Sequence, residues 1–374
     1  MSNKILVTGG AGFIGSFLVD ELIKEGNDVR ILDSLDSQVH PGGEKPLYIN
    51  KNAEFMKGDV SNLEDVKKAI EDVEIIFHEA ASVGIGQSNY QISKFVKTNS
   101  IGTANIFDAV INGNKTSVKK ILIPGSNTSY GEGMYKCDKC NIEFHSELRK
   151  SEQLIKKEWE IKCPTCSNFT VPIPVKEETD LLCNSVYSIT KKNQEELSLF
   201  LGEMYGLPVT VLRYFNVFGP RQSLSNPYTG VAAIFLSRIK NNNSPVIYED
   251  GLQTRDFISV NDVVRANIFA AQSKNADHEI FNVGSGKPIT IKNIAEILAS
   301  LCGKEIKPVI SGKSRKGDIR HCYADNSKIK EKLGFEIKTP FEDGMKELIA
   351  WSENIESVDK FDVARKELEE KGLA

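Results

Sequence analysis

Three glycines near the start of the chain constrain its fold more than any other feature. Gly9, Gly12 and Gly15 follow the apolar run KILVT (4–8) and precede SFLVDELIKEG, whose apolar residues recur every three or four positions. This order predicts a strand, a tight glycine turn and a helix. The free amides of such a helix N-terminus can receive a pyrophosphate. We therefore expect an α/β fold that binds a dinucleotide at the end of its first strand.

Further strand-like runs alternate with helical stretches up to residue 126. They cover 28–33, 53–59, 73–80 and 118–126. The alternation is typical of βαβ units, and it predicts a Rossmann fold with a doubly wound parallel sheet. We assign residues 1–215 to this domain, interrupted by an insert at 137–175, and expect the chain to return to it at 257–275. A smaller mixed α/β substrate domain is assigned to 216–256 and 276–355. Residues 356–374 are expected to form a charged C-terminal helix with a solvated face.

An acidic residue, Asp33, ends the second strand-like run. A carboxylate at this position accepts hydrogen bonds from the adenosine ribose and repels a 2′-phosphate, so NAD is favoured over NADP. The other predicted cofactor contacts are Phe13 and Ile14 after the glycines, Asp59 and Val60 near the adenine, and Ala80 and Ala81 beside the pyrophosphate and nicotinamide.

Composition argues against several partners. A net charge of -4 over 374 residues gives no electrostatic reason to expect nucleic acid or an anionic membrane. No apolar run approaches the roughly 20 residues of a transmembrane helix, and the first apolar stretch is too short for a signal peptide. We expect a cytoplasmic protein.

Four of the seven cysteines form two CxxC pairs, Cys137 with Cys140 and Cys163 with Cys166, separated by 22 residues. This spacing predicts a structural zinc site resembling a zinc ribbon, with no open position for water. The metal raises an alternative from another class, a zinc-ribbon interaction or nucleic-acid-binding module on an inactive dehydrogenase fold. Six basic residues balance six acidic ones between 137 and 166, which disfavours phosphate binding.

Tyr187 and Lys191 stand four residues apart at the start of a predicted helix, so their side chains share one face. A lysine ammonium beside a tyrosine favours the phenolate, so we expect Lys191 to lower the pKa of Tyr187 toward the working range of a general base.

The motifs TGGAGFIG, HEAA, GSNTSYGEG, YSITK, LRYFNVFGPRQ and RKGDIRHCYAD together resemble the extended short-chain dehydrogenase/reductase family of nucleotide-sugar epimerases and dehydratases. The resemblance implies that Ser126, Tyr187 and Lys191 are catalytic and that Lys191 also binds the nicotinamide ribose. It implies a cofactor-side, largely structural position for Asn99. It further implies substrate contacts from Asn216, Arg221, Arg255 and Arg315 to the diphosphate and from Asp318 to the nucleoside ribose. A homodimer is implied as well, formed by the helix after Asn99 and the helix that carries Tyr187, although the apolar residues Leu197, Phe200, Leu201 and Met204 could equally be an intramolecular core.

One departure from the family pattern bears on the reaction. The dehydratases of this family follow the catalytic hydroxyl residue with an Asp-Glu pair, whereas Asn127 and Thr128 stand here and cannot exchange protons in that way. The expected reaction is therefore epimerisation at sugar C4. The four-cysteine insert and the segment from RYFNVFG onward resemble bacterial epimerases acting on dTDP-L-rhamnose. UDP-glucose/galactose or their N-acetyl forms are the alternative, because Cys322 stands where hexose-selective members carry a tyrosine. The insert could cap the sugar pocket or widen the dimer contact.

Overall fold

The computed structural model describes residues 3–113 and 116–373, so the outermost residues of the assigned ranges 1–215 and 356–374 lie outside it. Its largest element is a seven-stranded, all-parallel sheet in the order β3-β2-β1-β4-β5-β9-β13. The strands are β1 (Lys4–Thr8), β2 (Asp28–Asp33), β3 (Glu54–Lys57), β4 (Ile75–His78), β5 (Lys120–Ser126), β9 (Val209–Tyr214) and β13 (Glu279–Val283). This confirms the predicted Rossmann fold.

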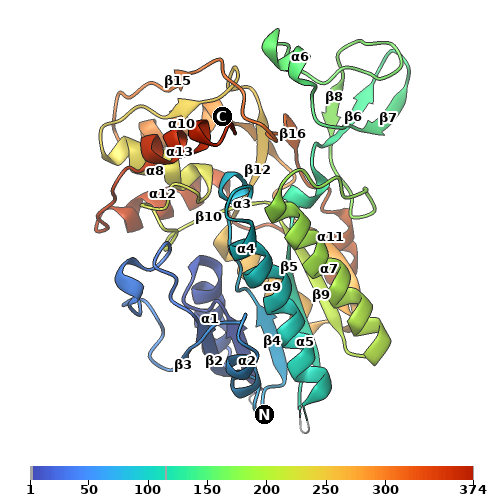
Figure 1. The fold of residues 1–374 in the computed structure, drawn as a ribbon, viewed down its shortest axis with the longest axis vertical. Coiled ribbons are helices and arrows are strands. Elements are labelled where there is room, and N and C mark those ends of the chain that lie inside the picture. The colour runs from blue at the N-terminus through green and yellow to red at the C-terminus, as the bar shows by residue number, and fades with distance from the viewer. Residues whose placement is uncertain (1–2, 114–115, 374) are drawn as a thin grey trace.

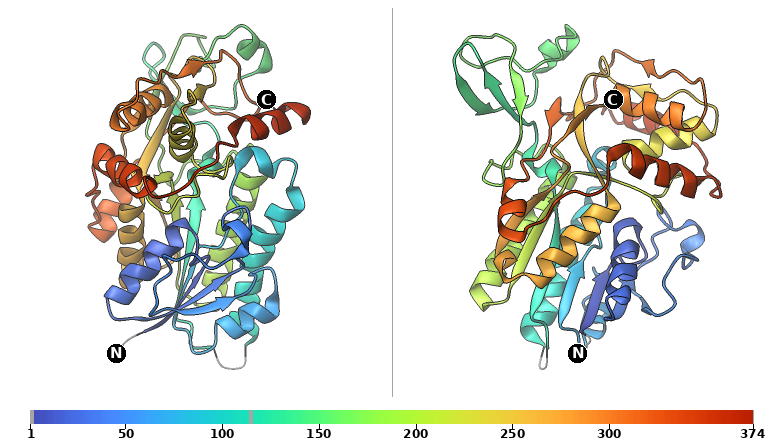
Figure 2. Two further views of the ribbon diagram at one scale, coloured as in Figure 1. Left: turned by 90° about the vertical axis from the view of Figure 1, so that its left-hand side faces the viewer. Right: turned by 180° about the vertical axis from the view of Figure 1, so that it is seen from behind.

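Helices cover both faces of this sheet. Figure 1 shows α5 (Gly102–Asn112) and α7 (Val186–Tyr205) on the near face, where α2 (Leu63–Ala69) joins them. The opposite face, seen in the right panel of Figure 2, carries α1 (Phe13–Lys24) and α9 (Val260–Gln272). Because both faces are covered, the strands are rich in aliphatic residues, most of them buried.

A smaller unit lies beyond the carboxyl ends of the large sheet. Its main sheet joins β10 (Asn216–Phe218), β12 (Thr254–Ser259), β14 (Pro288–Thr290) and β16 (His321–Cys322), and β11 (Val246–Ile247) pairs with β15 (Val309–Ile310). Its helices are α8 (Val231–Lys240), α10 (Ile291–Leu301) and α12 (Phe341–Ser352), which share a separate apolar core. The remaining helices near the large sheet are α3 (Ile85–Ser88), α4 (Ile92–Phe95), a π-helical turn at Val96–Ile101 and α11 (Ser327–Leu333). Short 3-10 turns span Pro41–Gly43, Asn127–Tyr130 and Lys274–Ala276.

The chain returns to the large sheet later than we expected. Beyond the return at 257–275, β13 pairs with β9 in the large sheet, although 279–283 was assigned to the second domain. The stretch that returns to the large sheet therefore extends to residue 283, beyond the assigned end at 275. The domain ranges themselves stay a prediction.

The insert projects from the body of the molecule beside the smaller unit (Figure 1). It is a three-stranded antiparallel sheet of β6 (Met134–Cys137), β7 (Ile142–His145) and β8 (Val171–Ile173), with the short helix α6 (Ser151–Ile155). It therefore begins three residues before the expected start at 137.

The last helix, α13 (Phe361–Glu370), is not simply solvated. Leu368 is buried and lies so close to Gly86 of α3 that a Cβ there would be 3.1 Å from Leu368 Cδ2. Glu367 accepts a hydrogen bond from Tyr228 of the smaller unit. This helix thus joins the two units. In the described part of the chain, no helix has both the length and the apolar character needed to cross a bilayer.

Candidate active site and metal centre

In the turn after β1, the backbone passes so close to neighbouring backbone that glycine is required. Gly9 has φ +67°, and a Cβ there would lie 2.8 Å from the backbone of Ala80 at the end of β4. A Cβ at Gly15 would lie 2.9 Å from Gly10 Cα. Gly12 caps α1, whose first turn contains Phe13 and Ile14. Side chains are thus excluded where a pyrophosphate would approach the backbone.

Asp33 lies at the end of β2 beside this turn. Its carboxylate accepts from the amides of Ala11 (2.9 Å) and Leu35 (2.8 Å), which fixes its orientation. Each oxygen keeps a lone pair for a ribose hydroxyl. Asp59 and Val60 follow β3, next to Asp33, since Gly58 N donates to Asp33 O (3.0 Å). The donor set and the glycine cradle therefore fit an NAD adenosine and pyrophosphate.

Two other predicted cofactor-side elements meet this region. Ala80 and Ala81 follow β4, and Ala80 N donates to Thr8 Oγ1 (3.2 Å). The buried Asn99 side chain bonds both backbone groups of Ser82 (2.8 and 3.1 Å) and Thr190 of α7 (3.0 Å). Asn99 therefore fixes the loop after β4 to the helix of Tyr187. These contacts are those of a structural residue.

The three predicted catalytic residues converge from β5 and α7. Ser126 is the last residue of β5, its hydroxyl lies 2.8 Å from Thr128 Oγ1, and it acts to lower the pKa of the nearby Tyr187 phenol. Tyr187 and Lys191 are both buried near the start of α7, whose first turn is capped by Ser185. The cap forms because Ser185 Oγ accepts from Ser188 N (3.1 Å) and fixes where the helix begins. The geometry thus places a hydroxyl and a phenol together at the end of a parallel strand.

The expected lowering of the Tyr187 pKa is wrong for the protein alone. Burial raises the pKa of Tyr187 above its ordinary 10.0, and only the nearby Ser126 hydroxyl opposes this rise. Lys191 instead donates to Gln194, one turn further along α7. Burial also lowers the pKa of Lys191 to about 8, against the opposing carboxylates of Glu79 and Glu195. Desolvation therefore sets the direction of the pKa shifts of both Tyr187 and Lys191 in the protein alone.

Sequence reasoning missed one titratable group in this site, Glu79. It follows His78 in the HEAA motif, and its carboxylate accepts from Tyr214 Oη (2.8 Å), which in turn accepts from Asn267 (2.6 Å). Burial raises the pKa of Glu79 to about 7, although Tyr214 and Lys191 oppose the rise. An acidic residue directly after an apolar strand was the available signal.

Three of the predicted substrate contacts lie together in the smaller unit. Arg315 forms two bonds with Asp318 (2.8 and 3.0 Å) and lies over the Tyr248 ring. Arg255 donates to the carbonyls of residues 319 and 320 (2.8 and 3.1 Å), the residues directly after Asp318. Asn216 at the start of β10 has a buried side-chain oxygen without a partner in the described part of the chain. An unpaired buried acceptor is costly and is consistent with a site that a ligand completes.

Arg221 lies elsewhere. Its guanidinium pairs with Asp20 of α1 (2.7 Å) and covers the rings of Phe17 and Tyr48. The structure therefore sets Arg221 against α1, on the side of the glycine turn. Its contact with the substrate diphosphate stays a prediction.

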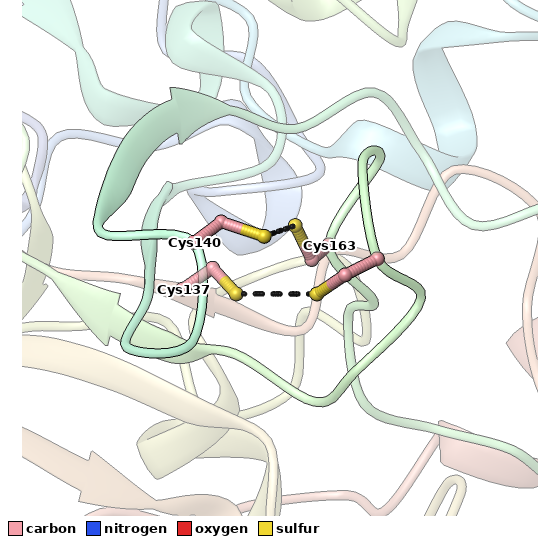
Figure 3. Close-up of side chains that lie close together, drawn as sticks. Cys137, Cys140 and Cys163 are labelled. Carbon is pink, nitrogen blue, oxygen red and sulfur yellow. Dashed lines mark hydrogen bonds between the residues drawn. The ribbon is translucent and has the colours of Figure 1, made fainter.

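The four paired cysteines face one another at the tip of the insert (Figure 3). All four sulfur atoms lie within 4.8 Å of one another, with 3.6 Å from Cys137 to Cys166 and 3.9 Å from Cys140 to Cys163. A tetrahedral zinc with Zn–S bonds of about 2.3 Å requires S···S separations of about 3.8 Å. The cluster therefore fits one metal ion with four thiolates and leaves no position for a catalytic water.

A Rossmann sheet with a glycine turn, an acid at the end of β2 and a Ser-Tyr-Lys set defines an NAD-dependent enzyme of the short-chain dehydrogenase/reductase type. Residues 5–147 and 164–284 match the NAD dependent epimerase/dehydratase family. The chain belongs to this family. Together with the relatives described next, this places it among the nucleotide-sugar 4-epimerases, which are isomerases.

Individual relatives cover nearly the whole chain. The dTDP-L-rhamnose 4-epimerase of Burkholderia thailandensis is 33% identical over 93% of this chain and 94% of its own. The crystal structure of UDP-glucose 4-epimerase with UDP-glucose from Thermotoga maritima is 32% identical, covers 94% of this chain and 98% of its own, and has a TM-score of 0.76. UDP-glucuronic acid 4-epimerase from Bacillus cereus, solved with UDP-glucuronic acid and NAD, is 25% identical, covers 94% of this chain and all of its own, with a TM-score of 0.76. These relatives share the epimerase chemistry but differ in nucleotide and sugar.

Proposed function

We propose that the protein interconverts dTDP-L-rhamnose and its C4 epimer, the dTDP-linked 6-deoxy-L-talose, by transient oxidation at sugar C4. The observation that carries the reaction type is the convergence of Ser126 at the end of β5 with the buried Tyr187 and Lys191 near the start of α7. Asn127 and Thr128 follow Ser126 in place of an acid and a base, which favours epimerisation over loss of water. The likeness to the Burkholderia enzyme favours the rhamnose substrate.

The residues of this chain have distinct parts in the reaction. Ser126 holds the sugar 4-oxygen, and the phenol oxygen of Tyr187 takes the proton from the 4-hydroxyl and later returns it. Lys191 holds the nicotinamide ribose and favours the phenolate once the site is filled. NAD supplies the acceptance and return of hydride at C4. Gly9, Gly12, Gly15 and Asp33 hold the cofactor, while Asn216, Arg255, Arg315 and Asp318 hold the nucleoside diphosphate as the keto sugar turns.

A UDP-hexose, glucose/galactose or an N-acetyl form, is the second candidate substrate. Its support is the 32% identity to the Thermotoga maritima UDP-glucose 4-epimerase. Cys322, which stands where hexose-selective members carry a tyrosine, is buried in a core cluster with Tyr130 and Phe215. A single hydroxyl or methyl difference changes pocket binding by only about 1–3 kcal/mol. The choice is therefore an experimental one.

Three further properties complete the proposal. The four cysteines hold one structural zinc ion, and a reducing cytoplasm keeps their thiols available for it. The protein acts as a homodimer through α7 and the segment of α4 and α5. On α7 the side chains of Ile189, Phe200 and Met204 are exposed, as are Ile92 and Val96 on the neighbouring segment, so a second copy could cover an apolar face there.

The test is incubation of the purified protein with a panel of dTDP-, UDP- and GDP-sugars without added NAD, followed by NMR of the anomeric and C4 protons. We expect interconversion of the dTDP-L-rhamnose pair with no loss of water and no net NADH. Interconversion of a UDP-hexose pair alone would contradict the rhamnose substrate and support the UDP-hexose as the substrate. Formation of a 4-keto-6-deoxy product would contradict the epimerase assignment.

A further inference from the structure

The base of the insert lies directly against the segment that follows Asp318. The carboxylate of Glu132, just before β6, accepts from the backbone amides of Arg320 (2.8 Å) and His321 (3.0 Å). It also accepts from Tyr135 Oη of the insert (2.8 Å). Glu132 is buried. One carboxylate therefore joins the first strand of the insert to the backbone of β16.

The far side of the insert is joined to the same segment. Val175 N donates to Tyr323 O (2.9 Å), and Asp325 N donates to Val175 O (2.9 Å). Tyr323 Oη also donates to Pro172 O in β8 (3.1 Å). Both ends of the insert are thus fixed to residues 320–325.

A buried ion pair reaches from the insert into the smaller unit. Arg149 of the insert pairs with Glu249 (2.7 Å), and both side chains are only 2% exposed. The same Arg149 nitrogen donates to the carbonyl of Asp318 (3.1 Å). Arg149 therefore contacts the backbone of a residue with a predicted role at the nucleoside ribose.

Arg320 extends this network, and its side chain is fully buried. It pairs with Glu160 of the insert (Nε to Oε1, 2.9 Å) on one side and with Glu249 (2.9 Å) and Asp250 (2.7 Å) on the other. Burial acts to raise the pKa of Glu160, but hydrogen bonds from His321 and Arg320 lower it to about 2. Loss of Glu160 leaves the buried Arg320 with Glu249 and Asp250 alone, and loss of Arg149 leaves the buried Glu249 paired only with Arg320.

The helix of the insert also reaches Arg315. A cavity of about 220 Å³ is lined by Leu154 and Ile155 of α6 and by Arg315 and Lys316. Arg315 itself pairs with Asp318. The insert therefore borders both residues to which the proposed function gives the nucleotide end of the substrate.

We propose that the insert is a positioning element for the nucleotide-binding segment 315–322, with Arg149 and Glu160 as positioning residues that act through Asp318 and Arg320. This inference rests on the proposed function, which assigns Arg315 and Asp318 to the nucleoside diphosphate. According to this inference the insert contributes to substrate affinity. An insert that only widened the dimer contact would make no such contribution. Loss of these contacts weakens nucleotide binding and leaves the hydride and proton steps at C4 unchanged.

The experiment compares Glu160→Gln and Arg149→Met with a matched control, Glu158→Gln. Glu158 lies two residues from Glu160, is similarly exposed (41% against 37%), and pairs with Lys162 within the insert. Isothermal titration calorimetry with UDP and with dTDP, on protein purified with its own NAD and metal, gives the Kd of the nucleotide alone. Steady-state assays with the sugar nucleotide that turns over give KM and kcat.

We expect the Kd of the bound nucleotide and the KM to rise about 5-fold in Glu160→Gln and about 10-fold or more in Arg149→Met, with kcat and NAD content unchanged. Glu158→Gln should match the wild type. Glu160→Gln keeps the shape of its side chain, so it tests the inference even if Arg149→Met does not fold. Equal Kd and KM in wild type and Glu160→Gln, or a fall in kcat with constant KM, would overturn the inference while the proposed function stands. Wild-type protein that binds neither UDP nor dTDP would overturn both.

Discussion

At the scale of single residues, the proposed general base Tyr187 is deeply buried. Its phenol is held between β5 and α7, and in the protein alone burial keeps its pKa above 10. A general base needs the phenolate, so the positive charges of Lys191 and of the oxidised nicotinamide must offset this desolvation when the site is filled.

Replacing Tyr187 by Phe removes the proposed base and keeps the ring. Turnover should fall by about 100-fold or more, because general base catalysis contributes on that order. NAD should stay bound, as measured by its release on denaturation. Tyr205→Phe, on the exposed end of the same helix, is the control and should remain fully active. Near-normal turnover in Tyr187→Phe would remove the assignment.

Glu79 should make stability depend on pH. Its folded-state pKa of about 7 exceeds the model-compound value of 4.5, so the native state binds its proton more tightly than the unfolded chain. The resulting stabilisation is fully present below about pH 4.5 and is lost as pH rises through 7. We expect the free energy of unfolding of the wild type to fall by about 2 kcal/mol relative to Glu79→Gln between pH 5 and pH 8.

Thermal or urea unfolding across this pH range measures the difference. Glu196→Gln, which changes an exposed carboxylate on α7, is the control and should follow the wild type. A constant difference between wild type and Glu79→Gln at all pH values would contradict the raised pKa.

At the scale of elements, the proposed zinc ion bears on the stability of the insert. Its three strands span four, four and three residues and, apart from the buried Tyr135 and the cluster itself, enclose little apolar surface. A structural zinc site contributes folding free energy of order 10 kcal/mol. Without it the antiparallel sheet has too small a core to persist.

Replacing Cys163 by Ser should therefore release the metal and open the insert to proteases. Elemental analysis should find about one zinc per wild-type chain and far less in Cys163→Ser, with new cleavage between 137 and 175. Cys302→Ser, outside the cluster, should retain both metal and protease resistance. A metal-free wild type that resists proteases would refute the structural role.

The sequence predicted the elements that repeat a strong local pattern. The boundaries of β1 and β2 were predicted correctly because aliphatic residues dominate each run and polar or glycine residues flank it. The strands of the insert and of the smaller unit were not predicted, since runs of two to six residues give too little periodicity.

The site divides in the same way. The glycine turn, Asp33 and the paired cysteines could be found because their partners are near in sequence or their spacing is distinctive. The bond of Arg149 to Glu249 joins residues 100 positions apart. In the sequence each is an ordinary charged residue, and nothing near it indicates that the two pair. The pKa of Tyr187 depends on burial, which no local pattern reports.

At the scale of the whole molecule, the exposed apolar face of α7 bears on assembly. Phe200 and Met204 lie one turn apart and are 57% and 60% exposed, whereas Leu197 and Leu201 are half-buried. Exposed aromatic and thioether side chains at helical spacing favour a contact with a second copy.

Phe200→Glu should therefore weaken dimer formation by placing a charge in an apolar contact. Sedimentation velocity at micromolar concentration should show a dimer for the wild type and a larger monomer fraction for the variant. Val363→Glu, which alters an exposed apolar residue on α13, should leave the dimer intact. A monomeric wild type would refute the proposed assembly.

The closed base of the insert has a consequence for the history of the gene. Leu182 N donates to Tyr130 O (3.4 Å), so the chain meets itself where it leaves the β5 end and where it comes back toward α7. The family match itself skips residues 148–163. Because the two ends already touch, codons between them can be acquired or deleted in one event with little cost in loop closure and no displacement of Ser126 or Tyr187. On the inference above, gain or loss of the insert would alter nucleotide affinity and leave the catalytic residues in place.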